Sequence, residues 1–175
     1  MKKIILTIIT LTTVLAGCAT MQSIVRSTFP YTATLMIPAG AKANTTLSVS
    51  SDASSFDQIF TGQGSTNQGV KEVRIASAKI DASNPSNQNL GAFKSIHIYI
   101  SRSDGSHEAL VASRTDIAPN VGTNLVLDID NSRFLDDYIK GPAMRIRMEY
   151  VLRQPLNMDA SVKASLGFSA APANR

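Results

Sequence analysis

The chain has 175 residues, of which 43% are hydrophobic and 17% are charged. This length suits one domain, and the apolar content excludes a disordered chain, which combines few apolar residues with a high net charge. The formal net charge is +4, and the basic residues are scattered along the chain. Because nucleic-acid-binding domains usually carry a basic patch or stripe, the sequence argues against a nucleic-acid partner.

Residues 1–17 have the pattern of a secretory signal peptide. Lys2 and Lys3 give a positive start, residues 4–14 form an apolar run, and small residues follow. This order of charge, apolar run and small residues is typical of an export signal, and the run is too short for a membrane span. We therefore expect residues 1–17 to be removed from the mature chain.

The single cysteine, Cys18, follows this leader directly. A disulfide within the chain needs a second cysteine, a metal site needs several ligands, and a catalytic thiol needs a base, which nothing nearby supplies. The residues LAGC, from Leu15 to Cys18, resemble the lipobox of bacterial lipoproteins. The resemblance implies cleavage between Gly17 and Cys18, a diacylglyceryl group on the Cys18 sulfur, and usually acylation of the new amine.

The same resemblance predicts a location and a partner, the membrane. Two or three acyl chains hold a protein stably at a bilayer, whereas one chain binds reversibly. In Gram-negative lipoproteins, an aspartate just after the cysteine often marks inner-membrane retention, but this chain has Ala19 and Thr20. We therefore expect the periplasmic face of the outer membrane, with display on the cell surface as the alternative.

After Cys18 we expect a lipidated tether over residues 18–27, one domain over residues 28–171 and a tail over residues 172–175. The first half of this domain contains three segments that alternate between apolar and polar side chains, as strands with one face on the core do. These segments are residues 29–37, 45–51 and 70–80. Residues 51–69 and 81–91 have loop composition, with a possible helical turn from Phe56 to Phe60.

The third segment changes its apolar face partway. Val73 and Ile75 lie on one face of an extended chain, whereas Ala76, Ala78 and Ile80 lie on the other. A β-bulge or bend would bring both sets onto the same side. We therefore predict such an irregularity within residues 70–80.

The second half contains five further strand-like segments and one helix. Asp104-Gly105 is a hairpin signal between the first two of these segments. The segments are residues 93–101, 107–114, 123–130, 144–153 and 158–170. Residues 131–142 carry apolar side chains at helical spacing, with Asn131 or Ser132 as the N-cap and Gly141-Pro142 as the stop.

About eight strands with turn signals between them, and one short helix, predict an all-β antiparallel sandwich of immunoglobulin-like or jelly-roll kind. A small closed barrel is the alternative. A domain of this kind resembles the small β-sandwich lipoproteins of bacterial envelopes. Sandwiches serve many functions, so the fold alone names none.

Two groups of residues have the composition of a metal site. Asp104, His107 and Glu108 lie together near the hairpin turn, and His97 lies on the preceding strand. Zinc needs three or four ligands in fixed geometry, so a solvated hairpin is the simpler interpretation.

The second group is Asp128, Asp130 and Ser132, which have the odd-position spacing of a calcium loop. An EF-hand also needs glycine at its sixth position and glutamate at its twelfth, where this chain has Arg133 and Ile139. A strand followed directly by a helix N-cap explains the positions of Asp128 and Asp130 equally well. We therefore predict neither a metal nor a cofactor.

Arg145, Arg147 and Arg153 alternate along one segment and are predicted to share a strand face. They could meet phosphates, lipid headgroups or an acidic partner, or form a solvated face together with Glu149. The chain has no G-x-S-x-G elbow and no phosphate-binding glycine loop.

These patterns predict a non-enzymatic, lipid-anchored envelope module that binds a protein or glycan, or is a structural subunit. The alternative is an accessory envelope hydrolase or metal-dependent enzyme with a loop-built site. A pocket that gathers His97, His107 and acids would favour the enzyme.

Overall fold

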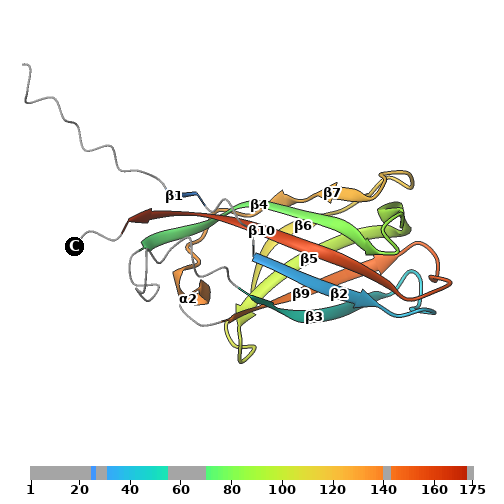
Figure 1. Ribbon diagram of the computed structural model, residues 1–175, viewed down its shortest axis with the longest axis horizontal. Helices are drawn as coiled ribbons and strands as arrows, with labels where there is room; N and C mark the ends of the chain where they lie inside the picture. Colours follow the sequence, from blue (N-terminus) through green and yellow to red (C-terminus); the bar gives the residue numbers. More distant parts are fainter. Residues whose placement is uncertain (1–24, 27–30, 55–69, 140–142, 173–175) are drawn as a thin grey trace, which may run out of the picture.

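The computed structural model describes residues 25–26, 31–54, 70–139 and 143–172 (Figure 1). The predicted signal peptide, its cleavage site, Cys18 and the predicted helical turn after Ser54 lie outside these residues. The elements are β1 Val25–Arg26, β2 Tyr31–Ile37, β3 Thr46–Ser54, β4 Val70–Asn84, the 3₁₀ helix η2 Leu90–Ala92, β5 Phe93–Arg102, β6 Ala109–Arg114, β7 Asn124–Val126, β8 Asp128–Ile129, α2 Asp136–Ile139, β9 Ala143–Leu152 and β10 Ala160–Pro172.

The strands form a sandwich of two antiparallel sheets, which confirms the predicted fold class. One sheet has the order β7-β4-β10-β2, with β1 also paired to β10. The other has the order β3-β9-β5-β6-β8. The sheets are joined between β2 and β3, where Thr32 pairs with Ser54.

The core lies between the two sheets and includes the predicted inward faces of β2, β5, β9 and β10. Its aliphatic side chains are accompanied by two edge-to-face aromatic pairs, Tyr31–Phe168 and Phe93–Tyr150. The inward residues of β2, β5, β9 and β10 are buried: Tyr31, Ala33, Leu35, Ile37, Ile96, Ile98, Ile100, Met144, Ile146, Met148, Tyr150, Leu152, Val162, Ala164, Leu166 and Phe168. Strand alternation was therefore sufficient to identify these core residues.

The predicted irregularity in β4 is present. Ile75 pairs with Phe168 and Ser77 pairs with Gly167, so Ala76 is the extra residue of a bulge. The bulge turns Val73, Ile75, Ala78 and Ile80 toward the core. Ala76 itself is exposed, so its predicted inward position is wrong.

The predicted helix is shorter than its sequence pattern. Among the described residues of this segment only Asp136–Ile139 is helical, and neither Asn131 nor Ser132 caps its start. Instead, the Asp130 carboxylate accepts hydrogen bonds from the Ser132 backbone N–H and hydroxyl, at 3.1 and 2.6 Å. This local turn competes with helix formation, as short polar side chains commonly do. None of the helices in the described part of the chain is long and apolar enough to span a membrane.

The two ends of the sandwich are formed by different strands and connections. The tether end holds β1, the start of β4 and the connection 130–139, and the distal end holds the connections 38–45, 85–92, 115–123 and 153–159. Along β10, Ala170 pairs with Val25 at the tether end, and Ser161 pairs with Asn84 at the distal end. Figure 1 shows β1 and the last part of β10 together at the left.

Candidate functional site

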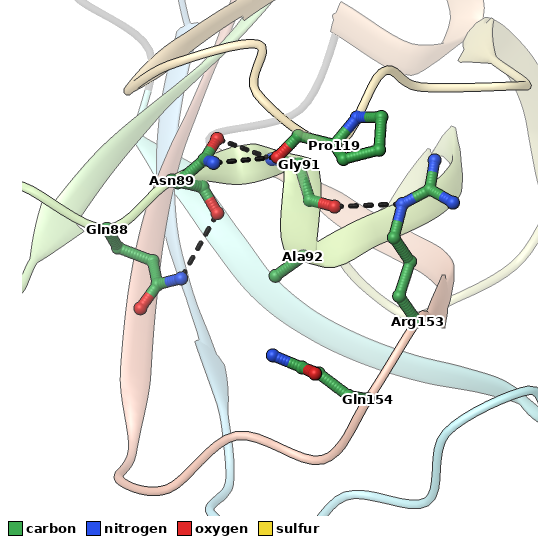
Figure 2. A pocket seen from close by; sticks show the side chains of 7 residues that line it. All are labelled: Gln88, Asn89, Gly91, Ala92, Pro119, Arg153 and Gln154. Carbon is green, nitrogen blue, oxygen red and sulfur yellow. Dashed lines mark hydrogen bonds between the residues drawn. The ribbon is translucent and has the colours of Figure 1, made fainter.

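A pocket of about 290 Å³ lies at the distal end of the sandwich (Figure 2). It is built where three connections meet, those that follow β4, precede β7 and follow β9. The lining residues are Gln88, Asn89, Gly91, Ala92, Pro119, Arg153 and Gln154. Its volume is near the lower end of the range for small-molecule sites, about 300–1,000 Å³.

Asn89 holds two of these connections together. Its amide Nδ2 donates to the Pro119 carbonyl at 2.7 Å, and its Oδ1 accepts from the backbone N–H groups of Gly91 at 2.9 Å and Gly122 at 3.1 Å. The bond to Gly91 also caps η2. One side chain thus fixes one wall of the pocket against another.

Arg153 connects the third segment to the same walls. Its Nε donates to the Gly91 carbonyl at 3.0 Å, its Nη2 donates to the Ile117 carbonyl, and its backbone N–H donates to the Ala92 carbonyl at 2.8 Å. The predicted placement of Arg153 on a strand face with Arg145 and Arg147 is therefore wrong. β9 ends at Leu152, and Arg153 then turns toward η2.

Gly91 allows this close approach. A Cβ at this position would lie 2.0 Å from the Pro119 carbonyl oxygen and 2.2 Å from its carbon. Both atoms are backbone, so neither can move aside alone. The sequence pattern did not reveal the requirement, because it arises from a contact with a residue in a distant connection.

The pocket wall combines amide side chains with small apolar groups. Gln88 Nε2 donates to the Asn89 carbonyl at 3.1 Å, and Figure 2 shows Gln154 beside the space that Gln88, Ala92 and Arg153 enclose. Amides both donate and accept hydrogen bonds, and Ala92 and Pro119 offer apolar contact. The set is suited to hydroxyl and amide groups of a neutral ligand.

The predicted arginine face exists around Arg147, on the outer side of the sheet that contains β9. Arg147 donates to Glu108 through Nε at 2.6 Å and Nη2 at 2.8 Å, and to Glu149 through Nη1 at 3.3 Å. Its guanidinium also lies 4.1 Å from the centroid of the Tyr99 ring. The hydrogen bonds from Arg147 lower the pKa of Glu108, and the same contact raises the pKa of Arg147. Arg147 thus has two carboxylate partners within this cluster. Arg145 lies beside it and donates to the Ser50 hydroxyl at 3.3 Å.

The histidines do not meet. His97 lies within β5, opposite Glu149 and Ser113, whereas His107 lies beyond the Arg102 end of the strand. A strand extends about 16 Å from residue 97 to residue 102, so the two histidines are too far apart to share one metal ion.

The acids of the hairpin have other partners than a metal. Glu108 binds Arg147, and Asp104 accepts a hydrogen bond from the Ser106 backbone N–H at 2.8 Å. Hydrogen bonds from Ser106 lower the pKa of Asp104. Within the described ranges, no three His, Cys, Asp or Glu side chains are grouped so that they could hold a metal ion.

The acids of the possible calcium loop are also separated in the structure. Asp128 forms an ion pair with Arg114 at 3.2 Å. Asp130 accepts the hydrogen bonds from Ser132 described above, which lower its pKa, and lies 3.8 Å from Arg133. The contact of Asp128 is typical of a strand end, and the contacts of Asp130 are typical of a turn.

Comparison with protein-family models finds no match, and comparison with curated proteins finds none either. Among solved structures, the chain is similar to one described as "Structural basis for the promiscuous specificity of the carbohydrate-binding modules from the beta-sandwich super family". The sequence identity is 10% and the TM-score is 0.30. The match covers 90% of this chain and 60% of that one, so this chain spans less than two thirds of that structure's length. This similarity is too low to bear on function.

Proposed function

We propose that the chain is a lipid-anchored protein of the bacterial cell envelope, and that its β-sandwich is a non-enzymatic module that binds a glycan in the distal pocket. The observation that carries the binding role is the wall of the pocket, where the amides of Gln88 and Gln154 lie beside apolar Ala92 and Pro119. Sugars present hydroxyl groups to amides and C–H surfaces to apolar groups. A pocket of about 290 Å³ has room for one or two sugar units.

The rigidity of the wall supports this role. Asn89 and Arg153 fix the backbone of η2 and of the connection before β7 by five hydrogen bonds, so the ligand does not have to order these segments on binding. A pre-ordered site loses less entropy when its ligand binds. The same bonds give partners to the backbone carbonyls of Gly91, Ile117 and Pro119.

The lipid anchor is supported by the sequence from Leu15 to Cys18 and by the export signal before it. We place the protein at the outer membrane, on its periplasmic face, because Ala19 and Thr20 follow the cysteine. The pocket lies far from the tether: β10 runs about 30 Å between Ser161 and Ala170, since a strand rises about 3.3 Å per residue. The pocket would then face away from the membrane that holds the anchor.

The anchor is tested by metabolic labelling of cells with a fatty-acid analogue. The wild-type protein should carry the label and be recovered with membranes. Cys18→Ala removes the sulfur that receives the lipid, so this variant should carry no label. A labelled Cys18→Ala protein would show that the lipid, if any, is attached elsewhere.

The pocket is tested by titration calorimetry against a panel of mono- and disaccharides, including N-acetylated sugars. The matched variants are Gln154→Ala, which removes a lining amide, and Asn157→Ala, which removes an exposed amide from the same connection outside the pocket. We expect Gln154→Ala to weaken binding about tenfold, the equivalent of one hydrogen bond of roughly 1.4 kcal/mol, and Asn157→Ala to leave it unchanged. Equal effects, or binding by no sugar of the panel, would contradict the proposal.

A further inference from the structure

A large apolar side chain is exposed at the tether end of the sandwich. Phe134 lies just before α2, and 52% of its surface is exposed. The next residue, Leu135, is fully buried and donates a backbone hydrogen bond to the Val73 carbonyl at 2.7 Å. Phe134 is therefore held at a fixed place on the surface by the residue beside it.

A cation covers one face of this ring. The guanidinium carbon of Arg74 lies 4.0 Å from the centroid of Phe134, within the range of a cation–π contact. Arg74 also donates through Nη1 to the Asn131 carbonyl at 2.5 Å. The pair thus joins an apolar ring to a positive charge on one exposed surface.

This pair lies close to the point from which the chain leads back to Cys18. Arg74 and Arg26 are both paired with Ser169, from opposite sides of β10. Strands in a sheet are about 4.8 Å apart, so the backbones of Arg74 and Arg26 are separated by about 10 Å. β1 is antiparallel to β10, so the step from Arg26 back to Val25 is toward the C-terminal end of β10.

The length of the tether limits how far this end can be from a membrane. The residues between Cys18 and Val25 span at most about 25 Å when fully extended. A lipid on Cys18 would therefore keep the tether end within that distance of the headgroups. The distal pocket would be about 30 Å farther away.

We propose that Phe134 and Arg74 contact the membrane surface when the chain is anchored through Cys18. Phe134 would enter the boundary between headgroups and acyl chains, and Arg74 would pair with lipid phosphates. This inference rests on the anchor of the proposed function and adds a second contact to it. The lipid holds the chain at the bilayer, and the pair then sets the orientation of the sandwich, with the pocket outward.

The chain contains no tryptophan, so a substituted tryptophan is a single fluorescent reporter. Phe134→Trp keeps an aromatic ring under Arg74. Met158→Trp is the matched control, because Met158 is 59% exposed and lies at the distal end. Both full-length variants, purified with their lipid, are reconstituted into vesicles of equal parts phosphatidylcholine and phosphatidylglycerol, with the phosphatidylcholine either brominated or plain.

Bromine quenches tryptophan only at short range. A ring that lies about 5–10 Å into the headgroup–acyl boundary should lose about half of its fluorescence in brominated vesicles, and the distal tryptophan should lose none. Adding Arg74→Gln to the Phe134→Trp variant should reduce the quenching. Unchanged quenching would overturn the role given to Arg74.

Two outcomes separate this inference from the anchor on which it rests. In the first, mass spectrometry shows lipid on Cys18 and the protein floats with the vesicles, but the Phe134→Trp variant is quenched no more than the Met158→Trp variant. The inference is then wrong and the anchor stands. In the second, Cys18 carries no lipid, so the anchor is wrong and the inference fails with it.

Discussion

The distal pocket and the cluster around Arg147 are held together by different chemistry. At the distal end, Asn89 and Arg153 bind backbone carbonyls and N–H groups, and no carboxylate takes part in these bonds. In the Arg147 cluster, the contacts join charged side chains, since Arg147 forms ion pairs with Glu108 and Glu149. Hydrogen bonds of the first kind do not change between mildly acidic and neutral pH, whereas ion pairs weaken when the acid is protonated or salt is added.

The difference indicates that the distal pocket is the region with the more fixed shape. Three separate connections converge at the distal pocket and are tied to one another by side chains. The Arg147 cluster lies on the surface, where ion pairs contribute little to stability. We therefore expect substitutions at the pocket to cost more stability than substitutions in the ion pairs.

The largest effect should come from Gly91→Ala. The added methyl group would overlap the Pro119 carbonyl and force η2 away from the connection before β7. Overpacking of this kind typically costs about 1–3 kcal/mol, and the rigid backbone on both sides places this case at about 3 kcal/mol. Urea unfolding of both proteins measures the difference.

Gly122→Ala is the control for Gly91→Ala. A Cβ at residue 122 would meet no atom within 4 Å, but its φ of +90° is unfavourable for alanine. The left-handed backbone costs about 1–2 kcal/mol. Equal losses in the two variants would show that contact with Pro119 is not what requires Gly91.

An intermediate effect is expected at Asn89. Asn89→Ala removes one donated and two accepted hydrogen bonds and should cost about 2 kcal/mol, less than three full bonds because water replaces part of them. Asn89→Asp keeps the acceptors for Gly91 and Gly122 but faces the Pro119 carbonyl with a negative charge. Thermal unfolding should rank wild type above both variants, and an unchanged midpoint in both would contradict the role given to Asn89.

The smallest effect is expected at Glu108→Gln. Glu108 is 39% exposed, so its pair with Arg147 contributes under about 1 kcal/mol. The hydrogen bonds from Arg147 lower the pKa of Glu108 below its ordinary value of 4.5. The contribution is therefore fully present above that value and is lost as the pH falls through the lowered pKa.

The free energies of unfolding of the wild type and Glu108→Gln, measured as a function of pH, should differ at pH 7 and converge in acid. A difference that grows as the pH falls would have the wrong sign for a lowered pKa. The distal variant Asn89→Ala should keep the same difference from wild type across this range, because no titratable group takes part in its bonds.

The sequence predicted the core because alternation along a strand depends only on local spacing. It also predicted the bulge in β4, since Val73 and Ile75 cannot share a face with Ala78 and Ile80 in a regular strand. It did not predict the pocket. Asn89, Pro119 and Arg153 are far apart in the sequence, and their meeting depends on how three connections fold over one end of the sandwich.

Two single residues show why local patterns were insufficient. Arg153 continues the alternation of polar residues in β9, but the strand ends at Leu152. Gly91 looked like an ordinary loop glycine, and only the contact with Pro119 shows why it has no side chain. The dipeptide Asn89-Leu90 before Gly91, with an N-cap residue followed by a short turn, was the one local signal that could have indicated η2.

The lipid anchor is tested most directly by mass spectrometry of the N-terminal peptide of the protein isolated from the membranes of its own cells. This peptide should begin at Cys18 and carry a diacylglyceryl group on the sulfur and an acyl group on the amine. A peptide that begins upstream of Cys18, or an unmodified Cys18, would contradict the lipid anchor.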